Sequence, residues 1–254
     1  MKTDQFQVHA DVEDRHWWFE GRRRILLDVV SLLLDGAGSP AVVDVGCGTG
    51  ANTAAIDRRF PCVGVDVSKE AVAAARRRFP GTRFICGPAP AALGAHAGEA
   101  DLFVLADVLE HVEDDRAFLA GLVAAAKPGA RFLITVPADP RLWTEHDVSF
   151  GHHRRYEPSR LRMAWDGLPV EEVAIVGLNT RLHPPIRVVR ALNRRLGRTS
   201  GRAGTDFSMP PAPVNAALTR LFAGESRRLR RDLAAGPGRS ARRGVSLLAV
   251  LRHG

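Results

Sequence analysis

The sequence predicts an α/β protein whose core is a doubly wound, mostly parallel sheet of seven strands. An apolar run at 41–45 breaks into glycines at 46, 48 and 50, as a buried parallel strand does where it turns into a helix. From there to residue 176, apolar runs of strand length alternate with helical patterns, which is typical of parallel sheets covered on both faces. With 254 residues, the chain can enclose a large core around such a sheet.

Composition is that of an ordinary globular protein, with 45% apolar and 25% charged residues. No apolar run approaches 18 residues, and the first residues are polar and acidic, so we expect neither a membrane span nor a signal peptide, and a cytoplasmic location. The cysteines Cys47, Cys62 and Cys86 share no metal-ligand spacing and lie in or beside predicted strands. We therefore expect reduced, buried thiols and no metal.

The net charge of +8 belongs to one part of the chain. Residues 181–254 hold 16 arginines and three acids, a local charge of +13, so residues 1–180 sum to −5. The positive excess therefore marks the last third of the chain and not the domain that begins with the glycine-rich turn.

The sequence predicts that residues 1–40 form an N-terminal helical lid. Apolar residues recur along one face of a helix over 15–35, and a Gly- and Pro-containing segment ends it. Aromatic rings from His16 to Phe19 gather at its start. They either anchor the helix to the domain or close over a ligand, with Trp18 against it and Arg23 or Arg24 turned toward an anionic group.

Residues 41–176 form the predicted core. Its elements after the first strand are a helix over 51–60, a strand over 62–66, a helix over 68–79, a strand over 82–86, a loop over 87–100, a strand over 101–106, a helix over 114–126, a strand over 131–136, a long polar loop over 137–157, a helix over 158–165 and a strand over 170–176. Loops that leave the carboxyl ends of strands form the ligand crevice in open α/β sheets, so we expect the polar loop to border a binding site.

The sequence predicts a basic helical insertion over residues 177–243. It also predicts that residues 244–254 form a last strand, which completes the sheet. The insertion is expected to hold a helical segment over 181–196, a linker over 197–213 and one amphipathic helix over 214–233. The last strand is the apolar run over 245–251.

The glycine-rich turn and Asp66 together indicate a site for an adenosine-containing cofactor. Asp66 ends the second strand, where an acid can accept hydrogen bonds from both ribose hydroxyls. The glycine spacing G-x-G-x-G differs from the G-x-G-x-x-G of dinucleotide sites, which disfavours a nicotinamide or flavin dinucleotide.

Four segments then carry a resemblance to the class I S-adenosylmethionine (SAM)-dependent methyltransferases. In order, they are VVDVGCGTG, GVDVS, ADVLEHVEDD and KPGARFLITVP, and the resemblance covers residues 41–136. The flanking segments HWWFEGRR, EHDVSFGHHRRY and GVSLLAVLR are similar to a bacterial subgroup that acts on small molecules. The resemblance implies SAM as cofactor, S-adenosylhomocysteine as product, and a last strand that is antiparallel beside the sixth. Residues 177–243 depart from the family, because its last two strands usually form a hairpin.

The resemblance also implies roles for single residues. The expected cofactor contacts are Trp18, Arg23, Asp44, Gly46, Cys47, Gly48, Gly50, Asp66, Val67, Asp107 and Leu109. Among them, Asp44 would orient the turn and the amino group, Asp66 would hold the ribose, Val67 would pack on the adenine, and Cys47 would be a small packing residue. The family's acid after the third strand is replaced by a Gly-Pro-Ala segment at 87–89, so backbone groups would contact the adenine.

Candidate catalytic residues are His111, His146, Asp147 and His152. Methyl transfer from a sulfonium mainly requires alignment, and a general base helps where the nucleophile carries a proton. His111 is either this base or a structural histidine at a helix start, and His146 with Asp147 is a second candidate. The expected acceptor contacts are Trp143, His153, Arg154, Arg155 and Tyr156. The two arginines either clamp a carboxylate or phosphate or only fix the loop.

The basic insertion leaves three interpretations open: a solvated helix packed on the domain, contact with an anionic membrane surface, or nucleic-acid binding. The last is disfavoured, because aromatic residues do not alternate with its arginines. The sequence therefore predicts a SAM-dependent enzyme that methylates an O, N or C nucleophile of a small-molecule acceptor, such as a natural product, a sugar or a lipid-linked compound. The alternatives are a related enzyme that uses SAM only as an electrostatic element, in a cyclisation or decarboxylation, and a nucleic-acid or membrane-docking module. The oligomeric state stays open.

Overall fold

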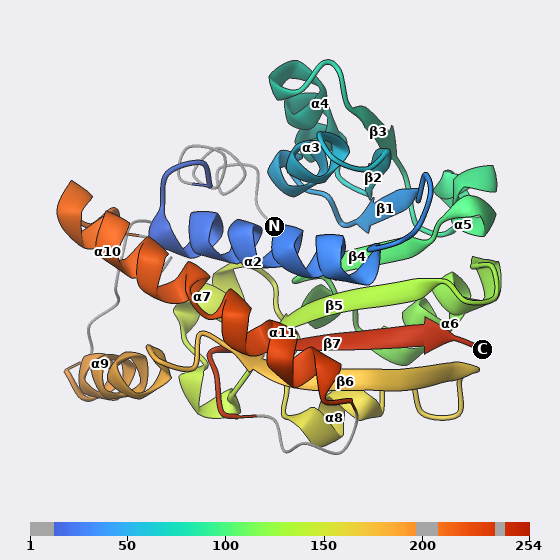
Figure 1. Cartoon of the computed structure of the whole chain (residues 1–254). Helices are drawn as coiled ribbons and strands as arrows, with labels where there is room; N and C mark the ends of the chain where they lie inside the picture. The colour runs from blue at the N-terminus through green and yellow to red at the C-terminus, as the bar shows by residue number, and fades with distance from the viewer. Residues whose placement is uncertain (1–12, 197–207, 237–241) are drawn as a thin grey trace.

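The computed structural model describes residues 13–196, 208–236 and 242–254, and its centre is a single seven-stranded sheet in the order β3-β2-β1-β4-β5-β7-β6 (Figure 1). The strands are β1 (Val42–Val45), β2 (Cys62–Asp66), β3 (Arg83–Cys86), β4 (Leu102–Ala106), β5 (Arg131–Pro137), β6 (Val170–Leu178) and β7 (Ser246–His253). β7 runs antiparallel to both of its neighbours, β5 and β6, and the pairs among β1 to β5 are parallel. The predicted fold class is confirmed.

Helices cover both faces of this sheet. They are α2 (Trp17–Leu33), α3 (Ala51–Asp57), α4 (Lys69–Arg78), α5 (Ala95–Glu99), α6 (Asp115–Ala125), α7 (Glu145–Ser149), α8 (Pro158–Arg162), α9 (His183–Arg195), α10 (Ala212–Ala223) and α11 (Ser226–Ala234), with short 3-10 turns η1 (Ala91–Leu93), η2 (Leu109–His111) and η3 (Pro140–Leu142). None of the described helices is both long and apolar enough to cross a membrane.

The alternation of side chains along β4 places them in two different core clusters, one on each face of the sheet. In β4, Phe103 and Leu105 join one cluster with α5, α6 and α8, and Leu102 and Val104 join the other with α2, α10 and α11. This is the period of two that a strand imposes on its side chains. Figure 1 shows α2, α10 and α11 side by side in front of the sheet.

The aromatic cluster of the N-terminal helix packs against the insertion. The ring of Trp18 stacks on Phe222 of α10 with centroids 5.2 Å apart, and Trp17 meets the same ring edge-on. The backbone amide of Trp17 donates to Asn215 Oδ1 at 2.8 Å. These contacts join residues about 200 positions apart, so α2 and the insertion together form one wall of the molecule.

Several local predictions were wrong. The loop expected over 87–100 contains η1 and α5, and the loop over 137–157 contains η3 and α7. The single helix expected over 214–233 is two helices, α10 and α11, because the chain turns at Gly224 and the buried Glu225 accepts hydrogen bonds from Thr180 and the Arg181 amide. Cys86 is exposed, whereas Cys47 and Cys62 are buried as expected. The linker over 197–213 lies mostly outside the described residues, as does the start of the lid over 1–40.

Candidate functional site

A cavity of about 1130 Å³ lies over the carboxyl ends of β1, β2 and β4. Strand ends supply its floor through Gly46, Asp66 and Asp107, and the start of α2 together with α9 and the segment over 146–155 supplies its walls. The volume exceeds the roughly 300–1,000 Å³ of a typical ligand pocket, so it can hold a cofactor and a second small molecule.

The three glycines of the turn after β1 have different surroundings. A Cβ on Gly48, whose φ is +53°, would meet nothing within 4 Å, so its backbone is bare toward the cavity. A Cβ on Gly50 would lie 2.7 Å from Phe84 and 2.9 Å from Ala75. Gly50 therefore serves the packing of α3 on its neighbours and, contrary to expectation, does not line the cavity.

Replacing Gly48 by Ala should weaken binding of a cofactor in the turn about tenfold or more while the fold survives. The added methyl points into open space, and the left-handed backbone costs only about 1–2 kcal/mol. Calorimetric titration and thermal unfolding measure the two effects. In Gly50→Ala we expect the reverse order, with a larger loss of stability because the methyl meets Phe84 and Ala75. Equal cofactor affinity in Gly48→Ala and the unmodified protein would contradict the assignment.

The carboxylate of Asp66 lies at the edge of the cavity and is held by the backbone. Its Oδ2 accepts from the Gly48 amide at 2.9 Å, and its Oδ1 accepts from the Ser68 amide at 2.8 Å. Each oxygen keeps a second lone pair for a ligand. Next to it, Val67 is 71% exposed and lines the cavity, so it offers an apolar surface to a flat ring.

Asp44 is buried beneath the turn and does not line the cavity. Its Oδ2 accepts from the Thr53 hydroxyl at 2.6 Å, and desolvation raises the pKa of its carboxyl to about 7. Asp44 thus ties β1 to α3 from beneath the cavity, whereas the sequence predicted that it would reach an amino group of the cofactor.

Asp107 follows β4 with a left-handed backbone, φ +59°, which is unusual for a residue other than glycine. Its carboxylate accepts from the Thr135 hydroxyl at 3.0 Å and forms an ion pair with Arg22 of α2. Arg22 lines the cavity but was not predicted as a site residue; of the three consecutive arginines, the prediction named the other two. Its position in the helix could have indicated that it faces inward, because it lies three residues after Phe19 and four before Leu26, which are both buried.

The other end of the cavity gathers histidines around a buried acid. Asp147 is fully buried, and its carboxylate accepts from Arg155 Nε at 2.8 Å, from His152 Nδ1 at 3.0 Å and from the Thr144 amide at 2.8 Å. Asp147 thus orients His152, five residues away, and its expected pairing with the adjacent His146 was wrong. The cavity is lined by His111, His146 and His152.

The environment keeps two of these imidazoles neutral. Burial lowers the pKa of His111 to about 4 and that of His146 to about 3. The ring of His111 meets that of His152 edge-on, with centroids 4.7 Å apart. Both rings lie beside Glu110, a fully buried acid that was missed as a site residue and whose pKa burial raises to about 8.

Comparison with known proteins supports the predicted family. A family model described as a methyltransferase domain matches residues 43–134, the segment that contains the glycine turn, Asp66 and Asp107. This segment is a methyltransferase domain, of the class I SAM-dependent kind that the sequence predicts. SAM as the cofactor and methyl transfer as the class of reaction agree with this match.

Curated relatives of this methyltransferase share part of its length. The ubiquinone biosynthesis O-methyltransferase of Idiomarina loihiensis is 28% identical over 162 residues, which are 57% of this chain and 67% of the relative. The trans-aconitate 2-methyltransferase of Rhodopseudomonas palustris strain BisB18 is 30% identical over 134 residues, 50% of this chain and 52% of the relative. The chain thus spans about half to two thirds of the length of these relatives.

Solved structures share the fold of the methyltransferase. The plantazolicin methyltransferase BpumL, in complex with S-adenosylhomocysteine, has a TM-score of 0.58 at 15% identity and covers 98% of this chain and 89% of its own. The [4+2]-cyclase SpnF has a TM-score of 0.54 at 17% identity, and the match covers 91% of this chain and 81% of SpnF.

The residues of the methyltransferase fit SAM at the glycine end of the cavity. Gly48 leaves its backbone open, Asp66 has free lone pairs, and Val67 exposes an apolar surface. Cys47, Trp18 and Arg23 also line the cavity. Burial raises the pKa of the Cys47 thiol, which suits a packing residue, and Arg23 Nη2 donates to the Glu13 carbonyl at 2.8 Å.

Other expected contacts of the methyltransferase lie outside the cavity. The residues concerned are Leu109, Trp143, His153, Arg154 and Tyr156. Leu109 is fully buried in the core, and the Tyr156 hydroxyl donates to Asp115 at 2.8 Å. Arg154 donates to the carbonyls of Val112 and Glu113, so it fixes the loop and does not clamp an acceptor. Arg155 does line the cavity, but its guanidinium is engaged with Asp147 and the Ala138 carbonyl.

Proposed function

We propose that this enzyme transfers the methyl group of SAM to an oxygen nucleophile of a small-molecule acceptor, and that the Asp147–His152 pair activates this nucleophile. One observation carries the proposal: a single cavity joins the glycine turn and Asp66 at one end to His152 at the other. A cofactor and an acceptor bound at these two ends would meet inside it.

The chain's own residues have two tasks in this reaction. SAM supplies an electrophilic methyl group, so Gly46, Gly48, Asp66 and Val67 would hold and orient it. Asp147 accepts the Nδ1 proton of His152, which fixes the tautomer and leaves the Nε2 lone pair of His152 for the acceptor. A positioned lone pair favours an acceptor whose nucleophile carries a proton, such as a hydroxyl.

Replacing His152 by Ala should lower the rate constant of methyl transfer about 100-fold or more and leave SAM affinity unchanged, because His152 lies at the acceptor end. The measurement combines a screen of phenols, sugars and hydroxy acids for formation of S-adenosylhomocysteine with calorimetric titration of SAM. His153→Ala is the matched control, since His153 is the next residue but is exposed and outside the cavity. If an acceptor is converted and no S-adenosylhomocysteine forms, the enzyme uses SAM only as an electrostatic element. Failure of SAM to bind would overturn the proposal.

We also propose that the enzyme is cytoplasmic and that α9 touches anionic membrane surfaces. The outward side of α9 exposes Val188 and Leu192 by 59% and 50%, beside arginines such as Arg187. Val189 and Arg190 of the same helix line the cavity, so docking there would bring a lipid-linked acceptor to its mouth. Flotation with vesicles that contain phosphatidylglycerol should recover the protein at low salt, and V188D/L192D should abolish recovery. Recovery with phosphatidylcholine vesicles alone, or equal recovery of the variant, would contradict this proposal.

A further inference from the structure

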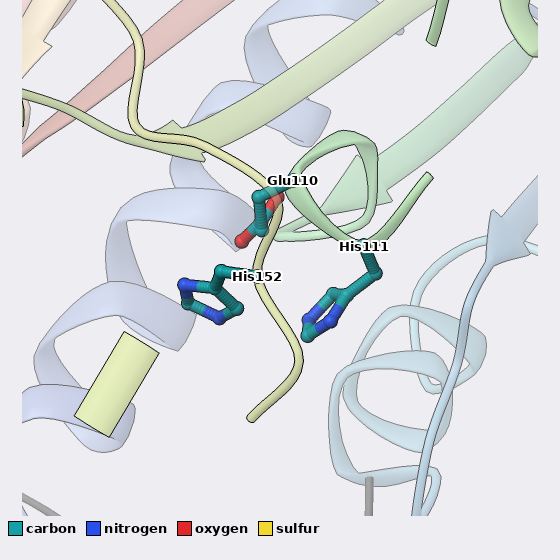
Figure 2. Close-up of side chains that lie close together, drawn as sticks. All are labelled: Glu110, His111 and His152. Carbon is teal, nitrogen blue, oxygen red and sulfur yellow. The ribbon is translucent and has the colours of Figure 1, made fainter. Parts of the chain in front are cut away.

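Glu110, His111 and His152 bring three potential metal ligands together at the acceptor end of the cavity. One ligand atom from each residue lies within 4.8 Å of the other two. Figure 2 shows that the carboxylate of Glu110 and the two imidazole rings lie close together, from the turn after β4 and from the segment after α7. The ligand types are a carboxylate oxygen and two imidazole nitrogens.

Glu110 is the member of this group that most needs a partner. It is fully buried, and neither of its carboxylate oxygens has a hydrogen-bond partner among the described residues. The two arginines whose charges act on Glu110 are engaged elsewhere: Arg22 forms an ion pair with Asp107, and Arg155 is held by Asp147. A buried carboxyl group with no hydrogen bond is rare, because desolvation without a partner is costly. A bound cation would supply the missing partner for both oxygens.

His152 is prepared as a ligand by the residue behind it. Its Nδ1 is 3.0 Å from Asp147 Oδ1, so Nε2 carries the lone pair. A carboxylate that fixes the tautomer of a histidine in this way is the usual support of a metal-bound histidine. Arg155 in turn donates to the same carboxylate, which keeps Asp147 ionised and in place.

We propose that Glu110, His111 and His152 bind a divalent transition metal ion of the zinc type, with its remaining coordination position open to the cavity. Two histidines and one carboxylate form a ligand set of zinc enzymes and of other divalent transition metals, and an open position is what distinguishes a catalytic site from a structural one. Such an ion polarises an acceptor oxygen as a Lewis acid. This catalytic role rests on the proposed function and shifts activation of the acceptor from His152 to the ion, because the Nε2 lone pair of His152 then binds the ion. Binding of the ion itself does not rest on that function.

The ligand set also explains why the sequence did not reveal a metal site. Glu110 and His111 are adjacent, and the third ligand follows 41 residues later, so no short motif contains all three. The three cysteines, which have no metal-ligand spacing, do not belong to this group.

Isothermal titration of the full chain with zinc chloride, without SAM or acceptor, tests the proposal. We expect one ion per chain, in a Cys86→Ser background that removes the exposed thiol. Glu110→Gln and His152→Ala should each weaken binding about 100-fold or more. His153→Ala should bind as the parent does, because the side chain of His153 lies outside the cavity. Thermal unfolding of each variant shows whether it is folded.

A second measurement needs no variant at the site. Cobalt(II) in the same background should give ligand-field bands of nitrogen and oxygen ligands without sulfur charge transfer. Absence of a tight site, retained affinity in folded His152→Ala, or a thiolate spectrum would each overturn the metal site. Because SAM binding is titrated separately, a chain that binds SAM but no metal would leave the proposed function standing.

Discussion

Replacing Asp66 by Ala should weaken SAM binding by about 100-fold or more. Asp66 lies at the carboxyl end of β2, and its two oxygens already accept from the Gly48 and Ser68 amides. The same carboxylate is proposed to accept from two ribose hydroxyls, and hydrogen bonds to a charged group contribute roughly 1.5–3 kcal/mol each. Loss of two such bonds, together with a looser glycine turn, gives the expected factor.

Calorimetric titration of SAM and S-adenosylhomocysteine measures this effect. Asp101→Asn is the matched control, because its carboxylate also accepts a backbone amide, that of Ala41 at 2.9 Å, but lies at the opposite end of the sheet. We expect the control to bind SAM as the unmodified enzyme does. Equal losses in both variants would show that the effect reflects stability of the sheet, and unchanged affinity in Asp66→Ala would place the cofactor elsewhere.

Replacing Asp147 by Ala should lower the free energy of unfolding by about 3–5 kcal/mol. The change leaves the guanidinium of Arg155, whose side chain is only 4% exposed, as a buried charge without its acid. It also removes the acceptor of His152 and of the Thr144 amide. Urea unfolding at pH 7 measures the loss.

An exposed ion pair provides the comparison. Arg162 and Glu172 form two hydrogen bonds of 2.8 Å, but the Arg162 side chain is 48% exposed, so Glu172→Ala should cost at most about 1 kcal/mol. Losses of similar size in the two variants would contradict the special role of the buried pair.

Asp147 also makes the stability of the folded protein depend on pH under acidic conditions. Burial alone would raise its pKa, but the hydrogen bond from His152 and the charge of Arg155 hold the pKa of Asp147 well below its usual value of 3.8. Its stabilising effect is therefore complete above that value and is lost as the pH falls below it. Asp147→Ala should accordingly show a shallower loss of stability below pH 4 than the unmodified enzyme.

The cofactor half of the site was largely predictable from the sequence. Gly48, Asp66 and Val67 lie where a strand ends, and the carboxyl ends of parallel strands meet along one edge of the sheet. Local spacing therefore determines their place. Spacing does not say whether a residue faces the ligand or the helix behind the turn, so it could not predict that Gly50 and Asp44 lie outside the cavity lining.

The acceptor half was less predictable, since its geometry depends on contacts between distant segments. Asp147 orients His152 because a turn after α7 brings residues five apart together. Arg22 enters the site because α2 lies across the end of β4, and no motif records that placement. Glu110 enters it because η2 follows β4, but the sequence does not show that its side chain is buried there. Likewise, the split between α10 and α11 depends on Glu225, whose partner Thr180 lies 45 residues away.

The position of β7 in the sheet affects when the sheet can be completed during synthesis of the chain. β7 lies between β5 and β6 and is the only strand that pairs with β6 among the described residues. During synthesis, β6 leaves the ribosome well before β7, so it has no strand partner until residues 246–253 emerge. Val245 and Ser246 also line the cavity. We therefore expect β6 and the adjoining part of the cavity wall to become ordered only after β7 emerges. A nascent chain that stops before β7 would carry the glycine turn but lack Val245 and Ser246 at the cavity.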